Sequence, residues 1–293
     1  MKSQQQHPAH FSLELFPPRT EVGRGKLPGI VAELAALQPA YFSVTFGAGG
    51  STQDGTWETV QMVRETTGLP AAPHISCIGS TRERIDALLA RYREAGIDRL
   101  VALRGDLPAT AHGIAAPGEF RFANELVAHI RETCGDHFRI EVAAYPEMHP
   151  QARNPVADFQ RFAEKVRAGA DAAITQYFYN AQAYFDFIER CEAADLAIPV
   201  VPGIMPITNF EMLTRFSDAC GAEIPRWIRL RLEQYRDDPE SLADFGVDAV
   251  AGLCRQLLDA GAPGLHFYTL NKVEPTLRLW KHLGLPVPCA VGA

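Results

Sequence analysis

Several features that would point to particular partners are missing from this sequence. The 293 residues carry a formal net charge of −7 and contain no long basic run, so no electrostatic footprint for nucleic acid or an anionic membrane is visible. No stretch reaches the roughly 18 apolar residues needed to cross a bilayer. Residues 1–10 lack the apolar core of a signal peptide. These absences predict a cytoplasmic protein without nucleic-acid or membrane partners.

Patterns typical of metal and dinucleotide sites are missing as well. The six cysteines are far apart and form no Cys-x-x-Cys pair, which favours buried thiols over a zinc site or a redox dithiol. The first strand-like segment has no His-x-His, which disfavours a metal hydrolase. No Gly-x-Gly-x-x-Gly follows that segment, which disfavours a dinucleotide-binding sheet. We therefore expect no metal centre.

What the sequence does contain is an alternation of short apolar runs with longer amphipathic segments. Apolar residues make up 47 % of the chain and charged residues 22 %, which is typical of a globular protein with a large core. Segments such as Thr81–Ala95 and Ala181–Ala194 repeat apolar residues every three or four positions, which predicts helices. The apolar runs predict eight strands, near Phe11–Phe16, Tyr41–Phe46, Ala72–Cys77, Arg99–Arg104, Arg139–Tyr145, Ala172–Phe178, Pro199–Met205 and Gly264–Leu270.

Eight strand–helix units in a chain of this length predict an α/β fold, a single (β/α)8 TIM barrel spanning residues 1–293. Residues 1–9 are expected to form a flexible tail. The segment Ile224–Ala262, between the seventh and eighth strands, is longer than one helix requires, and Asp237-Asp238-Pro239 marks a turn inside it. The sequence therefore predicts an extra helical insertion there, and no linker indicates a second domain.

Polar residues alternate with apolar ones along several predicted strands. Because the side chains of a strand point alternately to its two faces, one set is expected to face the barrel interior. The predicted interior set is Ser12, Glu14, Ser43, Thr45, His74, Ser76, Arg104, Asp106, Glu141, Tyr145, Gln176, His266 and Tyr268. On the fourth strand, this assignment places Val101 and Leu103 on the opposite face. Most of the polar set lies near the carboxyl ends of the strands, where barrel enzymes place their active sites, so we expect the site at that end.

These candidates also have structural alternatives. Glu14 could be a structural acid paired with Arg104, and His74 a satisfied core imidazole. Arg104-Gly105-Asp106 could form a local salt bridge, with Gly105 allowing a close backbone approach. Gly47-Ala48-Gly49-Gly50 could cradle a ligand or could form only a turn. The other candidates with a structural alternative are Tyr145 and His149, as loop anchors, and Phe216, as a core residue.

Eight short motifs lie along the chain, one in or after each predicted strand. They are Leu13-Glu14-Leu15-Phe16-Pro17-Pro18-Arg19, Ser43-Val44-Thr45-Phe46-Gly47-Ala48, Ala72-Pro73-His74, Val101-Ala102-Leu103-Arg104-Gly105-Asp106, Ala143-Ala144-Tyr145-Pro146-Glu147, Ile174-Thr175-Gln176, Pro202-Gly203-Ile204 and His266-Phe267-Tyr268-Thr269-Leu270-Asn271. In this order they resemble the methylenetetrahydrofolate reductase family, from about Phe11 to Leu285. The resemblance implies a barrel flavoprotein that binds FAD, takes hydride from NADH or NADPH and reduces 5,10-methylenetetrahydrofolate to 5-methyltetrahydrofolate for methionine synthesis. It also implies a homo-oligomer.

The resemblance and the chemistry together imply two catalytic residues. The bridging methylene accepts hydride readily only after its five-membered ring opens to an iminium cation, and ring opening requires a general acid that protonates the departing nitrogen. The resemblance gives this role to Glu14, whose inward, partly desolvated position favours a carboxyl that holds a proton near neutrality. Asp106 resembles the family's acidic residue beside flavin and folate, where its charge favours the cation.

The same resemblance implies the binding residues. Gln176 would contact the pterin, Phe216 and Tyr268 would lie near the aminobenzoate, and Lys272 would pair with the glutamate tail in place of the family's usual Arg. The positions matching the family's FAD site are Thr45, His74, Arg104, Gly105, Asp106, Ala123, Tyr145, His149, Asp158 and Lys165. Asp158 and Lys165 are seven residues apart, which predicts one helix face. Three positions at the adenine end of that site depart from the family pattern: Phe122, Arg161 and Glu164.

Two other functions fit the same fold. Lys272, at the end of the eighth strand, could form the Schiff base of a lyase or aldolase. A non-catalytic barrel that binds flavin or folate would need no acid at Glu14. The sequence does not distinguish NADH from NADPH, since it contains no separate nicotinamide-binding fingerprint. The chain ends soon after the last predicted helix, so we expect no attached regulatory domain.

Overall fold

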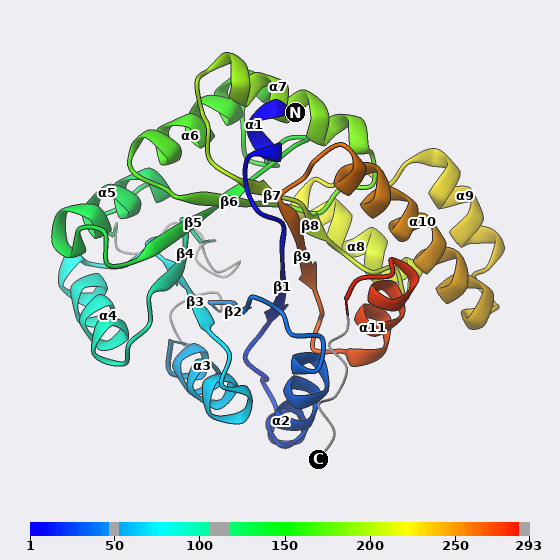
Figure 1. Cartoon of the computed structure of the whole chain (residues 1–293), viewed down its shortest axis with the longest axis horizontal. Coiled ribbons are helices and arrows are strands. Elements are labelled where there is room, and N and C mark those ends of the chain that lie inside the picture. Colours follow the sequence, from blue (N-terminus) through cyan, green and yellow to red (C-terminus); the bar gives the residue numbers. More distant parts are fainter. Residues whose placement is uncertain (47–52, 106–117, 287–293) are drawn as a thin grey trace.

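Parallel strands form a nearly closed barrel with helices packed around it (Figure 1). The computed structural model describes residues 1–46, 53–105 and 118–286. The strands are β1 (His10–Leu15), β2 (Tyr41–Val44), β3 (Ala71–Ser76), β4 (Arg99–Leu103), β5 (Arg139–Ala144), β6 (Ala172–Thr175), β7 (Val200–Val201), β8 (Gly203–Ile204) and β9 (Gly264–Tyr268). They lie in the order β7-β6-β5-β4-β3-β2-β1-β9-β8. The predicted barrel is therefore confirmed.

The helices alternate with the strands along the chain. They are α1 (Lys2–Gln5), α2 (Glu21–Ala35), α3 (Gln53–Thr67), α4 (Arg82–Glu94), α5 (Ala123–Cys134), α6 (Pro155–Arg167), α7 (Ala181–Ala193), α8 (Phe210–Cys220), α9 (Arg226–Gln234), α10 (Pro239–Asp259) and α11 (Val273–His282). Three of them, α8, α9 and α10, lie between β8 and β9, so the predicted helical insertion is also confirmed. The predicted turn at Asp237-Asp238-Pro239 is the start of α10, where Asp238 accepts a hydrogen bond from Ser241 N.

The predicted seventh strand is split in two at Pro202. Its first half, β7, pairs with β6, and its second half, β8, pairs with β9. Proline has no N–H to donate to a neighbouring strand, so the ladder breaks at this residue. The carbonyl of Pro202 still accepts a hydrogen bond from His266 N, at 2.9 Å. The two short strands together bring the two edges of the sheet close to closure.

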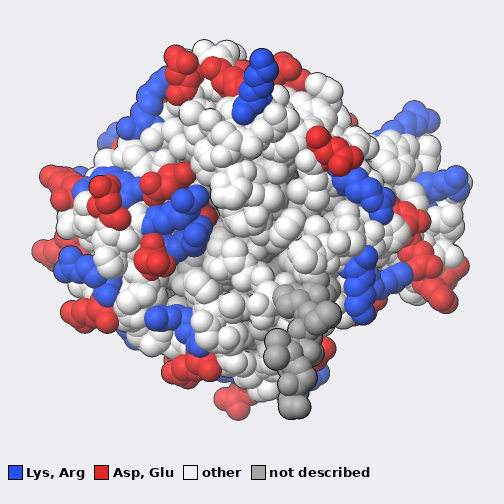
Figure 2. Space-filling model, viewed as in Figure 1, with Lys and Arg blue, Asp and Glu red and all other residues white. Residues whose placement is uncertain are grey.

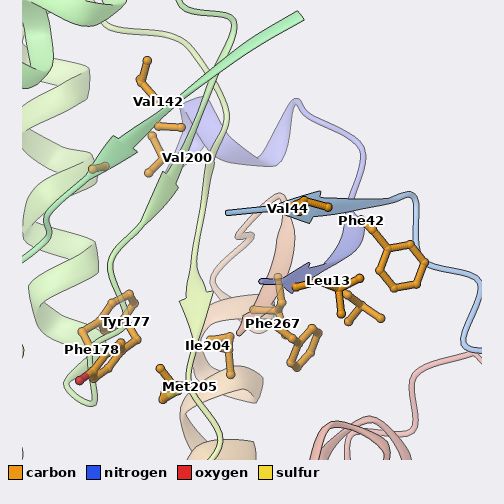
Figure 3. Packing of buried hydrophobic residues seen from close by; sticks show 14 of the residues in the cluster. Leu13, Phe42, Val44, Val142, Tyr177, Phe178, Val200, Ile204, Met205 and Phe267 are labelled. Carbon is orange, nitrogen blue, oxygen red and sulfur yellow. The ribbon is translucent and has the colours of Figure 1, made fainter. Parts of the chain in front are cut away.

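Apolar side chains on the outer face of the strands pack beneath the helices. Figure 3 shows Leu13, Phe42, Val44 and Phe267, from the neighbouring strands β1, β2 and β9, gathered on this face. All four are completely buried. The opposite parity of the same strands faces the interior, where the register places Ser12 beside His266, and Glu14 beside Tyr268 and Ser43. The predicted two faces of β1 and β9 are therefore confirmed.

The predicted facing of the fourth strand is wrong. The register aligns Val101 with His74 and Leu103 with Ser76, so Val101 and Leu103 face the interior. The outer face of β4 carries Leu100 and Ala102 instead. Strand β4 ends at Leu103, and Arg104 lies beyond it with the opposite parity. The prediction failed because it assigned polar residues to the interior, whereas this strand presents apolar ones there.

The amino terminus differs from the flexible tail that the sequence led us to expect. Residues 2–5 form α1, which Figure 1 shows beside α7 and the start of the seventh strand. Gln4 is completely buried; its Nε2 donates to Ile198 O, and its Oε1 accepts from Val200 N at 2.8 Å. Ser3 Oγ donates to Glu192 on α7. These long-range hydrogen bonds fix a segment that has no hydrophobic periodicity of its own.

Candidate active site

Glu14, near the carboxyl end of β1, lies between two histidines inside the barrel. Its Oε2 is 3.5 Å from His74 Nε2 on β3 and 3.6 Å from His266 Nε2 on β9. The Glu14 side chain remains 19 % exposed, whereas His266 is completely buried. His266 is held from below, since its Nδ1 lies 2.7 Å from Ser12 Oγ. The predicted inward position of Glu14 is therefore confirmed, and its carboxyl keeps some access to solvent.

The imidazole of His74 is held in its neutral form. Burial lowers the pKa of His74, and the adjacent charge of Glu14 offsets this effect only in part. Its Nε2 is buried and has no hydrogen-bond partner of good geometry among the residues that the structure describes. His74 is therefore not the satisfied core imidazole of the structural alternative. A buried polar atom without a partner costs stability, which is more typical of a binding site than of a core.

Tyr268 closes one side of this group. Its Oη donates to Thr175 O at 2.7 Å, and its ring lies 5.5 Å from the ring of His266. A Cβ atom at Gly203 would come within 2.7 Å of the tyrosine ring, so glycine at that position leaves space for it. Burial raises the pKa of Tyr268 well above its ordinary value, and the charge of Glu14 adds to the shift. The hydroxyl therefore stays protonated and keeps its bond to the backbone.

The three other predicted folate-binding residues differ in how they are placed relative to Tyr268. Gln176 directly follows Thr175 at the end of β6, and its Oε1 accepts from Tyr177 N at 3.0 Å. Phe216, on α8, is half-buried, and the adjacent Ser217 is bonded to Tyr177. Lys272 is exposed at the N-cap of α11. The structure therefore brings Gln176 and Tyr268 together through Thr175, and it shows no contact between Lys272 and the group around Glu14.

A cavity of about 640 Å³ opens beside the ends of β4 and β5, against α5 and α6. Seven of the ten predicted cofactor residues line it: Arg104, Gly105, Ala123, Tyr145, His149, Asp158 and Lys165. Thr45 and His74 lie outside its lining, and Asp106 lies outside the described residues, as does the segment 47–50. Most of a predicted binding set from four segments of the chain thus meets around one space.

The cavity is lined by a lysine and by the start of a helix that has no side-chain cap. Lys165 Nζ donates to Ala143 O, and no carboxylate lies within ion-pair distance of it in the described chain. Burial lowers the pKa of Lys165 to about 8, against the opposing effect of Asp158. Helix α5 begins after Phe122, whose side chain cannot cap the first N–H groups, and Ala123 lies on the cavity wall. A cation and an uncapped helix start are both favourable for phosphate groups.

Two backbone positions shape the cavity. Gly105 has φ +81°, and a Cβ atom there would come within 1.8 Å of Ser76 Oγ, so only glycine fits. His149 N donates to Asp158 Oδ2 at 2.8 Å, and the rings of Tyr145 and His149 meet edge to face at 4.6 Å. The loop after β5 is thereby anchored to α6. Asp158 and Lys165 both face the cavity from α6, as their spacing predicts.

Phe122, Arg161 and Glu164, at the expected adenine end of the site, form one group on the cavity wall. The guanidinium of Arg161 lies 4.0 Å over the ring of Phe122, and its Nη1 bonds Glu164 at 2.8 Å. All three residues line the cavity. These three residues therefore supply one another with partners at this end of the cavity.

Comparison with known proteins decides the family. The model of a family described as methylenetetrahydrofolate reductase matches residues 1–284. The chain belongs to the methylenetetrahydrofolate reductase family. It is 37 % identical to a 5,10-methylenetetrahydrofolate reductase of Salmonella typhimurium over 279 residues, which cover 94 % of this chain and 91 % of that protein. It is 36 % identical to the Escherichia coli protein of the same name, with the same coverage. Methylenetetrahydrofolate reductase activity, an oxidoreductase activity on folate, is supported for this chain.

Two further matches are a longer relative and a solved structure of low sequence identity. A probable methylenetetrahydrofolate reductase (NADH) of Oryza sativa is 37 % identical, but the match covers 94 % of this chain and only 48 % of that protein. A solved structure of an uncharacterized Clostridium thermocellum protein, described as binding two copies of 5-methyl-5,6,7,8-tetrahydrofolic acid, superimposes with a TM-score of 0.69. It covers 97 % of this chain at 17 % identity, which shows a shared fold.

Within this methylenetetrahydrofolate reductase barrel, a second inward glutamate lies at the opposite end and is fully paired. Glu141 is completely buried; Tyr41 Oη donates to its Oε2 at 2.6 Å, and Arg99 Nη1 to its Oε1 at 2.5 Å. Tyr41 and Arg99 were missed by the sequence reasoning. Tyr41 shares the parity of Ser43 on β2, which was a usable signal.

Two loop residues were also missed. Gln151 Oε1 accepts from Arg104 Nη2 at 2.6 Å, on the wall of the cavity. Glu147 Oε2 accepts from Glu223 N at 2.9 Å and so joins the loop after β5 to the segment after α8. Burial raises the pKa of Glu147, while its bond from Glu223 N opposes the shift. No periodicity marks such loop contacts in a sequence.

In the described residues, no three His, Cys, Asp or Glu side chains are arranged to hold a metal ion. No helix of that part is long and apolar enough to cross a membrane. On the face seen in Figure 2, positive and negative side chains are interspersed around the edge.

Proposed function

We propose that this protein binds FAD and reduces 5,10-methylenetetrahydrofolate to 5-methyltetrahydrofolate with hydride from NADH or NADPH. The observation that carries the proposal is the placement of Glu14 at the carboxyl end of the barrel, between two imidazoles and still partly open to solvent. The reaction of the family requires an acid. Of the two interior glutamates in the described chain, Glu141 is held in a short ion pair with Arg99, whereas Glu14 is not held in such a pair.

The residues around the 640 Å³ cavity fit a flavin dinucleotide. Lys165 and the uncapped start of α5 suit a pyrophosphate, and Gly105 permits a ligand to approach the backbone closely. Asp158 anchors the loop that carries Tyr145 and His149. When bound, FAD supplies a hydride acceptor and donor between the nicotinamide and the folate. Thr45, His74 and Asp106 complete the proposed binding set, and His74 lies beside Glu14.

Glu14 is proposed as the general acid that protonates the departing nitrogen when the folate ring opens. A neutral His74 can donate or accept a hydrogen bond, so it offers Glu14 a partner before and after the proton leaves. His266, fixed by Ser12, orients the other side of the carboxyl.

The remaining residues are proposed to bind and orient the folate. Gln176 would bond the pterin, with Tyr268 and Phe216 beside the aminobenzoate. Asp106 would stabilise the iminium cation, and Lys272 would bind the glutamate tail at the edge of the site, where its exposure suits a flexible anionic chain. That exposure disfavours the Schiff-base alternative, because a lysine nucleophile needs a desolvated amine.

The reductant and the cellular role are part of the same proposal. Relatives named as NADH enzymes in Oryza sativa and Arabidopsis thaliana support a reduced nicotinamide as the hydride source. The product would supply methyl groups for methionine synthesis in the cytoplasm, and the enzyme would act as a homo-oligomer.

The test separates the two half-reactions. The purified protein should show an oxidised flavin spectrum, lose it on addition of NADH or NADPH, and regain it with methylenetetrahydrofolate. In Glu14→Gln, bleaching should proceed as in the unchanged protein, while recovery with folate should slow by about 10²- to 10⁴-fold.

Glu141→Gln is the matched control, since it alters the other interior glutamate and should leave both half-reactions intact. A colourless protein would refute the flavin assignment. Equal recovery rates in Glu14→Gln and the unchanged protein would refute the acid assignment.

A further inference from the structure

The turn that follows β9 has an unusual backbone. Leu270 has φ +52° and Asn271 has φ +53°. Lys272 N donates to Thr269 O at 2.9 Å and closes the turn around these two residues. Turns with two successive residues in the left-handed region are dominated by Gly, Asn and Asp, and a bulky side chain such as leucine makes that conformation costly. Backbone strain of this kind persists only where the surrounding structure imposes it, commonly at functional sites.

The turn holds the end of the neighbouring strand β1. Thr269 is buried, and its Oγ1 donates to Glu14 O at 2.6 Å. Asn271 bonds both polar groups of Phe16: its Oδ1 accepts from Phe16 N at 3.1 Å, and its Nδ2 donates to Phe16 O at 2.8 Å. Asn271 N also donates to Thr269 Oγ1 at 3.1 Å, which joins the two contacts. The backbone that follows the Cα atom of Glu14 is thus held at three polar groups by one turn.

These bonds begin where the pairing of the sheet ends. The last register pair between β1 and β9 is Glu14 with Tyr268, and β1 itself ends at Leu15. The two imidazoles beside the Glu14 carboxyl lie at 3.5 and 3.6 Å, which is longer than a charge-assisted hydrogen bond. They hold the carboxyl only loosely. Its position therefore depends on the backbone that carries it, and the turn after β9 fixes that backbone.

We propose that Asn271 is a positioning residue for Glu14, which it holds in place through the backbone of Phe16. This proposal rests on the proposed function, in which Glu14 is the general acid. Asn271 acts on the strand that carries the acid, so its removal changes the rate of proton delivery more than the binding of folate. A catalytic group displaced by about 1 Å loses on the order of 10²-fold in rate, which is the gain that offsets the strained turn.

The test begins with Asn271→Gly, since glycine keeps the left-handed backbone and removes only the amide. In the flavin-free protein, the Phe16 amide should exchange with deuterium at least about tenfold faster, because it loses its acceptor. In the FAD-loaded protein, the return of flavin absorbance with saturating methylenetetrahydrofolate should slow by about 10- to 100-fold. Bleaching by NADH or NADPH, and the folate concentration that gives half the maximal rate, should stay within about twofold.

The double variant Glu14→Gln/Asn271→Gly separates positioning from a general loosening of the fold. Once the acid is absent its placement no longer matters, so the double variant should reduce folate within about twofold of the rate of Glu14→Gln. Thr269→Val removes the hydroxyl that bonds Glu14 O and should slow the same step as Asn271→Gly does. Asp195→Gly is the matched control, at an exposed residue with φ +54° in the turn after α7, and should change neither half-reaction.

Three results would overturn the proposal while leaving the acid role of Glu14 intact. They are unchanged exchange of the Phe16 amide in Asn271→Gly, an unchanged folate half-reaction in that variant, and a further slowing when Asn271→Gly is added to Glu14→Gln. The last result would show a structural defect, because such a defect lowers the rate whether or not the acid is present. An unchanged rate in Glu14→Gln alone would refute the proposed function and this proposal together.

Discussion

The two ends of the barrel each hold a glutamate that faces the interior, and their surroundings differ. At the amino end, Glu141 is completely buried and held by Tyr41 and Arg99. At the carboxyl end, Glu14 is partly exposed and faces two histidines at 3.5 and 3.6 Å. A buried carboxylate with a cation and a hydroxyl is a structural element, whereas a partly exposed carboxyl beside imidazoles retains freedom to exchange a proton.

The same difference extends to the neighbours. At the amino end, Arg99 and Tyr41 both bond Glu141, and the ring of Tyr41 also lies 4.3 Å from the guanidinium of Arg99. At the carboxyl end, His74 and Lys165 have pKa values lowered by burial. Such groups lower the stability of the fold and are retained for binding or catalysis. Mutations at the two ends should therefore change different measured quantities.

The largest expected effect on stability separates the two glutamates directly. Glu141→Gln leaves Arg99 without its carboxylate and should lower the free energy of unfolding by about 2 to 3 kcal/mol. Glu14→Gln leaves no arginine or lysine without its partner and should change the free energy of unfolding by less than about 1 kcal/mol. Urea denaturation of both variants measures this. A larger loss in Glu14→Gln than in Glu141→Gln would remove the distinction between the two ends.

The sequence alone could not make this distinction. Strand periodicity correctly turned both Glu14 and Glu141 inward, because alternation is a local property of the chain. The partners that separate them, His266 for one and Arg99 for the other, come from strands far away in sequence. Parity also failed on β4, where Val101 and Leu103 present apolar side chains to the interior.

Elements that depend on tertiary contacts were equally hidden. Helix α1 has four residues and no apolar stripe, and the hydrogen bonds of Gln4 to Ile198 and Val200 hold it in place. Gln151 and Glu147 lie in loops, where no periodicity indicates a partner. The resemblance supplied the expected cofactor set, and seven of its ten members meet at one cavity.

A second, somewhat smaller effect should appear as a gain in stability. The pKa of Lys165 falls from 10.5 to about 8, so between these values the unfolded chain binds more protons than the folded one. The free energy of unfolding of the flavin-free protein should therefore rise with pH through that window. Below about pH 8 the full loss of stability caused by burying the charged lysine is present. Lys165→Met removes it and should stabilise the flavin-free protein at pH 7 by about 2 kcal/mol, allowing for partial solvent screening.

The same variant should bind flavin more weakly, which fluorescence titration with FAD measures. Lys26→Met, at an exposed position on α2, is the matched control and should alter neither stability nor flavin affinity. If Lys165→Met were less stable than the unchanged protein, the charge of Lys165 would stabilise the fold, as the paired charge of Arg99 does at the amino end.

Glu147 is intermediate between the two ends and should give the smallest effect. It is partly buried; among the described residues it has one hydrogen bond, from Glu223 N, and no cation within ion-pair distance. Its pKa is raised above 4.5, so the folded protein binds more protons than the unfolded chain just above that pH. The free energy of unfolding should consequently fall as pH rises through this window, and the loss should persist at neutral pH.

Glu147→Gln keeps an oxygen for the bond from Glu223 N and removes the ionisable group. It should flatten this part of the pH profile and stabilise the protein at pH 7 by less than about 1 kcal/mol. Glu223→Gln, which removes only the neighbouring charge that also raises the pKa of Glu147, should flatten the profile less. Thermal unfolding between pH 4 and pH 7 measures both. If the free energy of unfolding kept the same slope with pH in Glu147→Gln, the Glu147 carboxyl would be as fully paired as that of Glu141. Glu14, His74 and Lys165 would then be the remaining groups whose surroundings do not fully pair them.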